Sequence, residues 1–262
     1  MYKRQTFPTV KSPNPENPEG FYLAVDLAKE VGSDLILGTD PDSDRVGVMV
    51  RGADGEYHTI TGNQMGVLLL DYIITARRRK GTLPENAAAI STIVTSKMVR
   101  RICDVNDIHF DETFTGFKFM AEKLAEYQRD GSYQYVLAFE ESYGYMMGDY
   151  VRDKDAVTAC VMITEMAAYY FEQGMTLAQA LDALYEKYGF YGERTLNLVM
   201  PGLDGLEKMR ALMAQLRREP LQEIAGTKVV RMRDYQDGSV YVMGLGKMDK
   251  TCLLYTSPSP RD

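Results

Sequence analysis

Three aspartates alternate in the segment DPDSDR, residues 40–45, directly after a short apolar run. Carboxylates at alternate positions of a tight turn converge their oxygens on one point, and this arrangement is costly unless a hard cation lies there. Arg45 beside them is planar and permanently charged, so it suits a phosphate group. Asp40, Asp42 and Asp44 therefore predict a cation site next to a phosphate.

An acidic surface turn is the simplest alternative for this segment. An EF-hand loop starting at Asp40 is excluded, because it requires glycine at position 45 and glutamate at position 51, and both positions hold arginine. A phosphatase of the haloacid-dehalogenase type also places alternating aspartates after an apolar strand. Its motif has threonine or valine where Asp44 stands, so it is the weaker alternative.

A second polar segment, FEESYGY at residues 139–145, ends another apolar run. Ligands of open α/β sheets collect at the carboxyl ends of strands. Glu140 and Ser142 lie two positions apart, so a carboxylate and a hydroxyl can accept from and donate to neighbouring sugar hydroxyls. Taken alone, the segment fits a solvated acidic loop better.

Two further segments carry a lysine at a predicted helix start. RDKD, residues 152–155, offers Asp153 or Asp155 as a cap, and Lys154 adds positive charge to backbone amides that already suit a phosphate. TGFK, residues 115–118, reads by itself as a threonine cap followed by a solvated lysine. Neither segment identifies a site alone.

The composition narrows both the chemistry and the partners. The 262 residues include 30 Lys and Arg against 37 Asp and Glu, and the net charge of −7 disfavours duplex nucleic acid and anionic membranes as partners. Only His58 and His109 are present, and the three cysteines lack metal-site spacing, which disfavours zinc sites and disulfides. No apolar stretch is long enough to span a bilayer and no signal peptide is evident, so we expect a soluble cytoplasmic protein.

The elements that would position these segments alternate between helices and strands. Helices are predicted where a capping residue, apolar residues at helical spacing and a terminating glycine follow one another, and one helix begins at a capping box of Thr61 and Gln64. Strands are predicted where short runs of residues are apolar or alternate between apolar and polar. The predicted helices cover residues 18–31, capped by Asn17, and 61–79, 96–106, 115–127, 154–173, 177–188 and 204–217. The predicted strands cover residues 35–37, 46–50, 56–60, 88–94, 108–111, 135–139 and 228–231, with a further one from Thr195. This order favours an α/β fold with a largely parallel or mixed sheet.

In this order the four segments resemble the motifs of the α-D-phosphohexomutase family, which contains the phosphoglucomutases, phosphomannomutases and relatives. The likeness is greatest to the bacterial phosphoglucomutase type. DPDSDR is similar to the family's magnesium loop, TGFK to its third-domain substrate loop, FEESYGY to its sugar-specificity loop and RDKD to a substrate-phosphate contact. SPNPENP and TGNQMG extend the likeness, which covers residues 6–238.

The resemblance implies ligands and the residues that contact them. Mg²⁺ would be the cofactor, a hexose phosphate the substrate, and glucose 1,6-bisphosphate the intermediate and activator. The implied Mg²⁺ ligands are Asp40, Asp42 and Asp44. The implied substrate contacts are Arg45, Thr115, Lys118, Lys154, and, on the sugar hydroxyls, Glu140 and Ser142.

The resemblance also implies a division into domains. Residues 6–60 would end domain 2 and carry the metal loop, residues 61–192 would form domain 3, and residues 193–250 would open a truncated domain 4. Residues 1–5 and 251–262 look non-native, the latter because CLLYTSPSPRD ends in low-complexity serine and proline. We therefore expect an internal fragment of a longer mutase, without its domain 1 and most of its domain 4.

The family's phosphoserine has no counterpart here, so we expect no catalytic residue in this chain. Residues 12–15 resemble the nucleophile pattern Ser-His-Asn-Pro only superficially, because Ser12 lies 28 positions before Asp40 and Pro13 replaces the histidine. Tyr145 stands where some relatives have a histidine in the sugar loop, which puts a proton-shuttling role at that position in doubt.

The implied activity is that of an isomerase, which interconverts hexose 1- and 6-phosphates by phosphoryl transfer through a bisphosphate. Two alternatives stay open. One is a stand-alone module that binds a sugar phosphate or a metal without catalysis, and the other is the haloacid-dehalogenase-like phosphatase. The four segments do not distinguish glucose, mannose and pentose phosphates.

Overall fold

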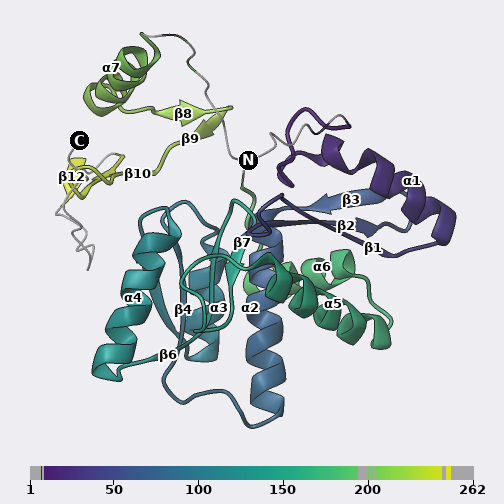
Figure 1. The fold of residues 1–262 in the computed structure, drawn as a ribbon. Helices are drawn as coiled ribbons and strands as arrows, with labels where there is room; N and C mark the ends of the chain where they lie inside the picture. The colour runs from purple at the N-terminus through teal and green to yellow at the C-terminus, as the bar shows by residue number, and fades with distance from the viewer. Residues whose placement is uncertain are drawn as a thin grey trace, which may run out of the picture. The chain divides into compact units, whose positions relative to one another are not determined.

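The structure is a computed structural model that describes residue 7, residues 9–193, 200, 202 and 204–243, and the backbone of residues 246–248. The chain divides into two units, Met1–Glu193 and Arg194–Asp262. All candidate site residues lie in the first unit, which consists of two sheets and the helices around them (Figure 1).

The first sheet is an antiparallel meander of β1 (Leu35–Thr39), β2 (Val46–Arg51) and β3 (Tyr57–Ile60). Its turn between β2 and β3 contains Gly55 at φ 81°, as the Asp-Gly pair predicts. Helix α1 (Tyr22–Val31) follows a 3₁₀ turn, η1 (Pro18–Phe21), and covers one face of the sheet. The core between them consists of Phe21, Ala28, Ile36, Met49 and Tyr57.

The second sheet has the order β5-β4-β6-β7. Its strands are His109–Thr113 (β5), Ala87–Thr92 (β4), Gln134–Glu140 (β6) and Gly144–Met146 (β7). β4 runs parallel to β5 and β6, whereas β7 returns antiparallel to β6. The sheet is therefore mixed, which confirms the predicted α/β class.

Helices cover both faces of the second sheet, because alternate side chains of a strand point to opposite sides. α4 (Phe117–Asp130) packs on one face, against Ala88, Ile90 and Ala138. The other face contributes to the main core. The helices of that core are α2 (Gly62–Arg79), α3 (Met98–Asn106), α5 (Ala156–Glu172) and α6 (Leu177–Tyr188).

The main core also joins the two sheets. Val46, Val48 and Val50 of β2 are at most 3% exposed and belong to the same cluster as α5 and the second sheet. Because this cluster is continuous, the turn after β1 is held at a defined place relative to the loop after β6. These two segments carry the aspartates and Glu140.

Helix α2 approaches the second sheet closely through glycines. A Cβ atom at Gly66 would overlap the ring of Phe139, and one at Gly62 would overlap the backbone carbonyl of Glu141. The capping box that begins α2 forms as predicted, with Thr61 Oγ1 accepting from the Gln64 amide at 3.2 Å. The start of α2 therefore supports the loop that follows β6.

Gly62→Ala is expected to lower the melting temperature, because the methyl group has to displace the backbone of Glu141. Over-packing of this kind costs about 1–3 kcal/mol. Thermal unfolding measures the effect. Gly20→Ala is the matched control, since the nearest atom to a Cβ there is 3.9 Å away. Equal melting temperatures for the two variants would contradict the close contact.

Most predicted elements are confirmed, with differences where local signals were ambiguous. Asn17 precedes η1, but its side chain makes no capping hydrogen bond. Thr115 does not cap α4, whose N-cap is Gly116 at φ 113°. Strand β7 begins within FEESYGY, the segment that fits a solvated acidic loop when taken alone. It forms by pairing with β6, and this pairing is not a local signal. Asp155, one of two predicted caps, accepts from the Val157 and Thr158 amides.

The second unit begins, among the described residues, with α7 (Gly205–Arg218). A short hairpin of β8 (Glu223–Ile224) and β9 (Thr227–Lys228) is followed by an antiparallel meander of β10 (Arg231–Asp234), β11 (Ser239–Val242) and β12 (Gly246–Met248). The strand predicted at residues 228–231 is interrupted: Lys228 ends β9, Arg231 begins β10, and residues 229–230 join the two strands. The strand predicted from Thr195 begins in a segment outside the described residues.

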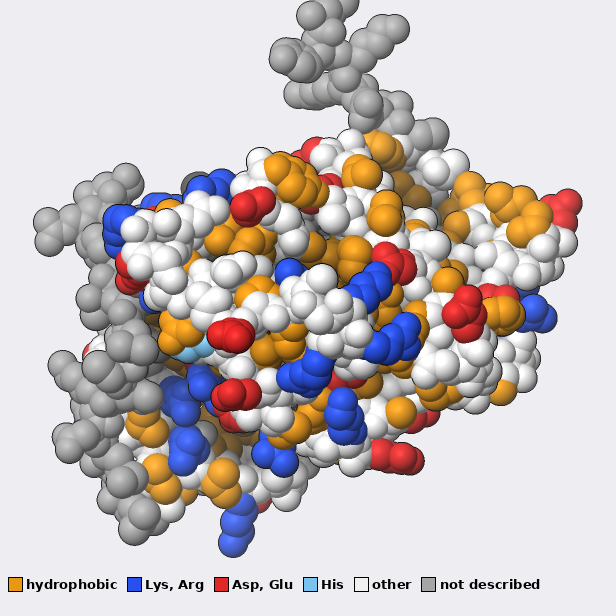
Figure 2. Space-filling model, turned by 90° about the horizontal axis from the view of Figure 1, so that it is seen from below, with side chains coloured by type: hydrophobic (Ala, Val, Ile, Leu, Met, Phe, Trp, Pro, Cys, Tyr) orange, Lys and Arg blue, Asp and Glu red, His pale blue; other side chains and the backbone are white. Residues whose placement is uncertain are grey.

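Charge is unevenly spread over the surface despite the net acidity. Figure 2 shows Lys and Arg side chains gathered near the centre of one face, with acidic side chains more scattered. Helix α2 ends in three arginines, of which Arg78 donates to Asn106 and Arg79 lies over the ring of Tyr169.

Within the described parts of the chain, no helix is both long and apolar enough to cross a bilayer.

Candidate functional site

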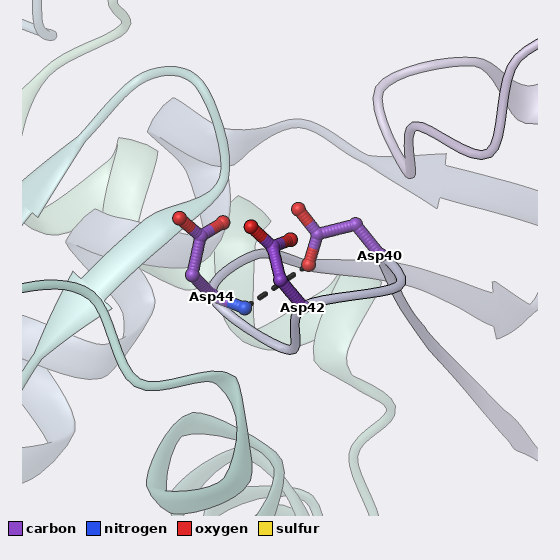
Figure 3. Close-up of side chains that lie close together, drawn as sticks. All are labelled: Asp40, Asp42 and Asp44. Atoms are coloured by element: carbon purple, nitrogen blue, oxygen red, sulfur yellow. Dashed lines mark hydrogen bonds between the residues drawn. The ribbon is translucent and has the colours of Figure 1, made fainter. Parts of the chain in front are cut away.

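The turn between β1 and β2 brings the three aspartates together. Asp40 Oδ1 accepts hydrogen bonds from the backbone amides of Asp44 and Arg45, each at 3.0 Å, and so closes the turn with its own side chain. Ser43 adopts a left-handed conformation with φ 57° at the tip. One carboxylate oxygen from each of Asp40, Asp42 and Asp44 lies within 4.8 Å of the others (Figure 3).

The electrostatics of this turn favour a bound cation. Burial, together with the neighbouring Asp44 carboxylate, raises the pKa of Asp40 above its ordinary value. Asp44 Oδ1 is buried and receives no hydrogen bond from the described residues. A buried acceptor without a donor is unfavourable, and a hard cation prefers carboxylate oxygens. The donor set therefore fits a divalent cation such as Mg²⁺.

The loop after β6 lies beside this turn. Tyr143, at φ 67°, turns the loop so that its carbonyl accepts from the Val46 amide at 3.1 Å. Gly144 forms an isolated antiparallel bridge with Arg45. The segment predicted to hold the cation and the segment predicted to hold the sugar are thus joined by backbone hydrogen bonds.

Glu140 is the last residue of β6 and is partly buried. Its Oε1 accepts from the Gly116 amide at 2.5 Å, and its Oε2 accepts from the Ser142 hydroxyl at 3.4 Å. Burial raises the pKa of Glu140, although the Gly116 hydrogen bond acts against it. The pair predicted from FEESYGY is therefore in contact, and Glu140 also orders the loop that carries TGFK.

Lys154 connects the cation turn with the start of α5. Its ammonium lies 2.9 Å from Asp44 Oδ2 and 2.8 Å from Asp153 Oδ1, and its side chain is 15% exposed. Burial acts to lower the pKa of Lys154, but the hydrogen bonds to Asp153 and Asp44 outweigh it, and the pKa is raised. Gly144 leaves room for the aliphatic stem, since a Cβ there would lie 2.5 Å from Lys154 Cδ.

The residues of TGFK lie near Lys154, but some of their side chains are exposed and others are buried. Thr115 and Lys118 are exposed, and Lys118 Nζ lies 5.9 Å from the centre of the Phe119 ring. The Phe117 ring lies under the Lys154 ammonium at 5.2 Å. The structure thus brings Asp40, Asp42, Asp44, Arg45 and Lys154 into one cluster. It places Glu140 and Ser142 beside that cluster and leaves Thr115 and Lys118 in solvent at its edge.

Two acidic residues near the site escaped the sequence analysis. Glu16 accepts from Arg45 Nη1 at 2.8 Å, although its segment, SPNPENP, contributes only to the family likeness and predicts no role for Glu16. Glu141 Oε2 accepts from the hydroxyls of Thr92 and Thr95 at 3.2 and 3.4 Å. No local pattern identifies either contact, because the partners are at least 29 positions away.

Ser12 and Tyr145 lie in contrasting surroundings, one at the surface and the other in the core. Ser12 is exposed on the wall of a cavity of 280 Å³ that Asp40 also lines. Tyr145 is 1% exposed, and its hydroxyl donates to the Gly62 carbonyl at 3.3 Å. Its position in the core, with a pKa raised well above the ordinary value by burial, suits packing and not proton transfer.

Comparisons with known proteins identify the family to which the chain belongs. Residues 61–188 match the family model described as "Phosphoglucomutase/phosphomannomutase, alpha/beta/alpha domain III", and residues 1–55 match the corresponding domain II. A phosphoglucomutase of Staphylococcus aureus strain bovine RF122 / ET3-1 is 37% identical over 235 residues, which are 90% of this chain and 42% of the relative. The phosphoglucomutase of strain USA300 is 36% identical over the same lengths. The chain thus spans less than half the length of these relatives.

Solved structures show the same fold. A phosphoglucomutase/phosphomannomutase family protein of Burkholderia thailandensis aligns with a TM-score of 0.52 at 17% identity, over 88% of this chain and 43% of its own. Parafusin, a phosphoglucomutase of Paramecium in its open form, aligns with a TM-score of 0.52 at 18% identity, over 88% and 39%. The chain thus matches two adjoining domain models of one family and has a fold similar to that of solved family members. The chain belongs to the phosphoglucomutase/phosphomannomutase family.

Proposed function

We propose that this chain supplies the cation site and the sugar-phosphate site of a phosphohexomutase, an isomerase that interconverts hexose 1- and 6-phosphates. The observation that carries the proposal is the shared carboxylate of Asp44. One of its oxygens is buried without a donor, and the other holds Lys154 at the start of α5. A cation bound at the first oxygen would therefore lie beside Lys154, which would bind phosphate, and both would lie next to the carboxylate–hydroxyl pair of Glu140 and Ser142.

Asp40, Asp42 and Asp44 would hold Mg²⁺, which when bound neutralises negative charge on a phosphoryl group. The protein's share is positioning. Asp40 accepts two backbone amides while one of its oxygens stays close to the other two carboxylates, so hydrogen bonds within the turn itself hold its shape. Such preorganisation lowers the cost of binding.

Arg45 and Lys154 would contact phosphate oxygens, and Thr115 and Lys118 would contact the substrate from the edge of the site. Glu140 and Ser142 would bind hydroxyls near the middle of the sugar. Because a mutase binds its intermediate in two orientations, contacts near the middle serve both of them. The exposed position of Thr115 and Lys118 agrees with a role in a substrate contact.

In the complete reaction, a phosphoserine donates its phosphoryl group to the free hydroxyl of a hexose monophosphate, which yields a bisphosphate and a free serine. The bisphosphate reorients, and its other phosphoryl group returns to the serine. We assign that serine to a part of the protein that precedes residues 6–60, the end of domain 2. Residues 61–192 would be domain 3 and residues 193–250 the start of domain 4, and this chain alone would bind ligands without turnover.

The test is a thermal-shift titration of the chain with glucose 1,6-bisphosphate in the presence and absence of Mg²⁺. A ligand at 100 times its dissociation constant adds about 2.7 kcal/mol to stability. We expect stabilisation that depends on both components, because the cation and the phosphate share one site. Glucose is the matched control, since it offers the hydroxyls without phosphates. A folded chain that neither component stabilises would refute the proposal, and release of inorganic phosphate by the chain would favour the phosphatase.

A further inference from the structure

Glu16 lies in the segment before α1, in a position that local structure holds firmly. The side chain of Asn14 accepts from the Glu16 amide at 3.0 Å, and the Asn17 amide donates to the Asn14 carbonyl at 3.0 Å, so Glu16 lies within a closed turn. Pro15 is buried against β2, where a Cβ at Gly47 would lie 2.7 Å from the Pro15 carbonyl oxygen. The turn is therefore docked on the strand that begins just after Arg45.

The Arg45 guanidinium lies between two carboxylates. Its Nη1 donates to Glu16 Oε1 at 2.8 Å, and its Nε lies 3.8 Å from Asp44 Oδ1. The first distance is that of a charge-assisted hydrogen bond, and the second is too long for one. Asp44 Oδ1 is the buried oxygen that no described group reaches with a hydrogen bond.

Without Glu16, Asp44 would be the nearest alternative partner for Arg45. A small rotation of the guanidinium would bring Nε within hydrogen-bond distance of Asp44 Oδ1, and the gain would include relief of that unpaired acceptor. An arginine bound there would compete with a cation for the same oxygen. Lys154 already holds the other oxygen of Asp44 at 2.9 Å, so both oxygens would then be taken.

We propose that Glu16 is a positioning residue that holds Arg45 away from Asp44, which keeps Asp44 Oδ1 available for the cation and the guanidinium available for phosphate. This inference rests on the proposed cation site. Stability is not a sufficient reason for the ion pair, because the Arg45 and Glu16 side chains are 33% and 31% exposed, and pairs this exposed contribute little to folding.

The test is a double-mutant cycle in which calorimetry measures Mg²⁺ binding to the full chain. Glu16→Ala is expected to weaken Mg²⁺ binding by about fivefold or more when Arg45 is present, as for other contacting pairs. In an Arg45→Met background the same substitution is expected to change the affinity by less than about twofold. Loss of a nearby negative charge alone would weaken binding equally in both backgrounds.

A control variant and melting curves distinguish a specific effect of Glu16 from a general loss of charge or of folding. Glu19→Ala removes an exposed glutamate three positions away and is expected to leave Mg²⁺ affinity unchanged, and melting curves show that each variant is folded. Equal effects of Glu16→Ala in the two backgrounds, or no effect in either, would overturn the positioning role while the cation site stands. If the folded parent chain binds no Mg²⁺, the proposed cation site itself is wrong and the positioning role with it.

Discussion

Asp44→Asn is expected to abolish measurable Mg²⁺ binding at millimolar concentrations, with a loss in affinity of about hundredfold, because affinity depends on the number of charged ligands. The amide would keep the size of the side chain but remove the charge. It would also remove one of the two carboxylates that position Lys154, whose ammonium lies 2.9 Å from Asp44 Oδ2. We therefore expect the bisphosphate to bind more weakly even without Mg²⁺.

Calorimetric titration with Mg²⁺, followed by the bisphosphate, measures both effects. Asp153→Asn is the matched control, because it removes the other carboxylate partner of Lys154, at 2.8 Å, without touching the cation turn. It is expected to leave Mg²⁺ affinity within about twofold of the parent chain, as for surface charges. If both variants bind Mg²⁺ like the parent, the three aspartates are an acidic turn and not a cation site.

Glu140→Gln is expected to weaken bisphosphate binding by about thirtyfold, since a hydrogen bond to a charged group contributes about 1.5–3 kcal/mol. The same variant is expected to melt at or above the temperature of the parent chain at neutral pH. Burial raises the pKa of Glu140 above its ordinary value of 4.5, so the ionised carboxylate costs stability in the folded state. Glutamine can still accept the Gly116 amide without that cost.

The raised pKa of Glu140 also predicts how the stability difference between Glu140→Gln and the parent chain changes with pH. A carboxyl group whose pKa is raised on folding binds more protons in the folded state, so its contribution favours folding at low pH. That contribution is lost as pH rises from 4.5, the unfolded value, through the folded pKa. The advantage of Glu140→Gln should therefore be largest at neutral pH and vanish toward pH 4.5.

Thermal melts between about pH 4 and pH 8 test this expectation across the titration range of glutamate. Glu172→Gln, at the exposed end of α5, is the control for removing a glutamate away from the site. A Glu140→Gln variant that is clearly less stable than the parent at neutral pH would show that the carboxylate is needed for folding. In that case a weakened affinity could not be assigned to sugar binding.

The features that the sequence alone predicts are those made by residues close together in the chain. The capping box at Thr61 and the aspartate cap at Asp155 depend on residues within one turn of their helices, and both are present as predicted. The aspartate turn is equally local, because Asp40 accepts amides only four and five positions away. Interactions of this range depend on the order of residues and little on the rest of the fold.

Tertiary structure alone decided which of these segments meet. Lys154 lies 110 positions after Asp44 yet holds its carboxylate, and Glu16 reaches Arg45 across 29 positions. Strand β7 exists only because β6 offers it a partner. Such contacts follow from the core that joins the two sheets, and no spacing rule within the sequence encodes them. The residue types could therefore be predicted from sequence, whereas their pairing required the packing of β2, β6 and α5 around one hydrophobic core.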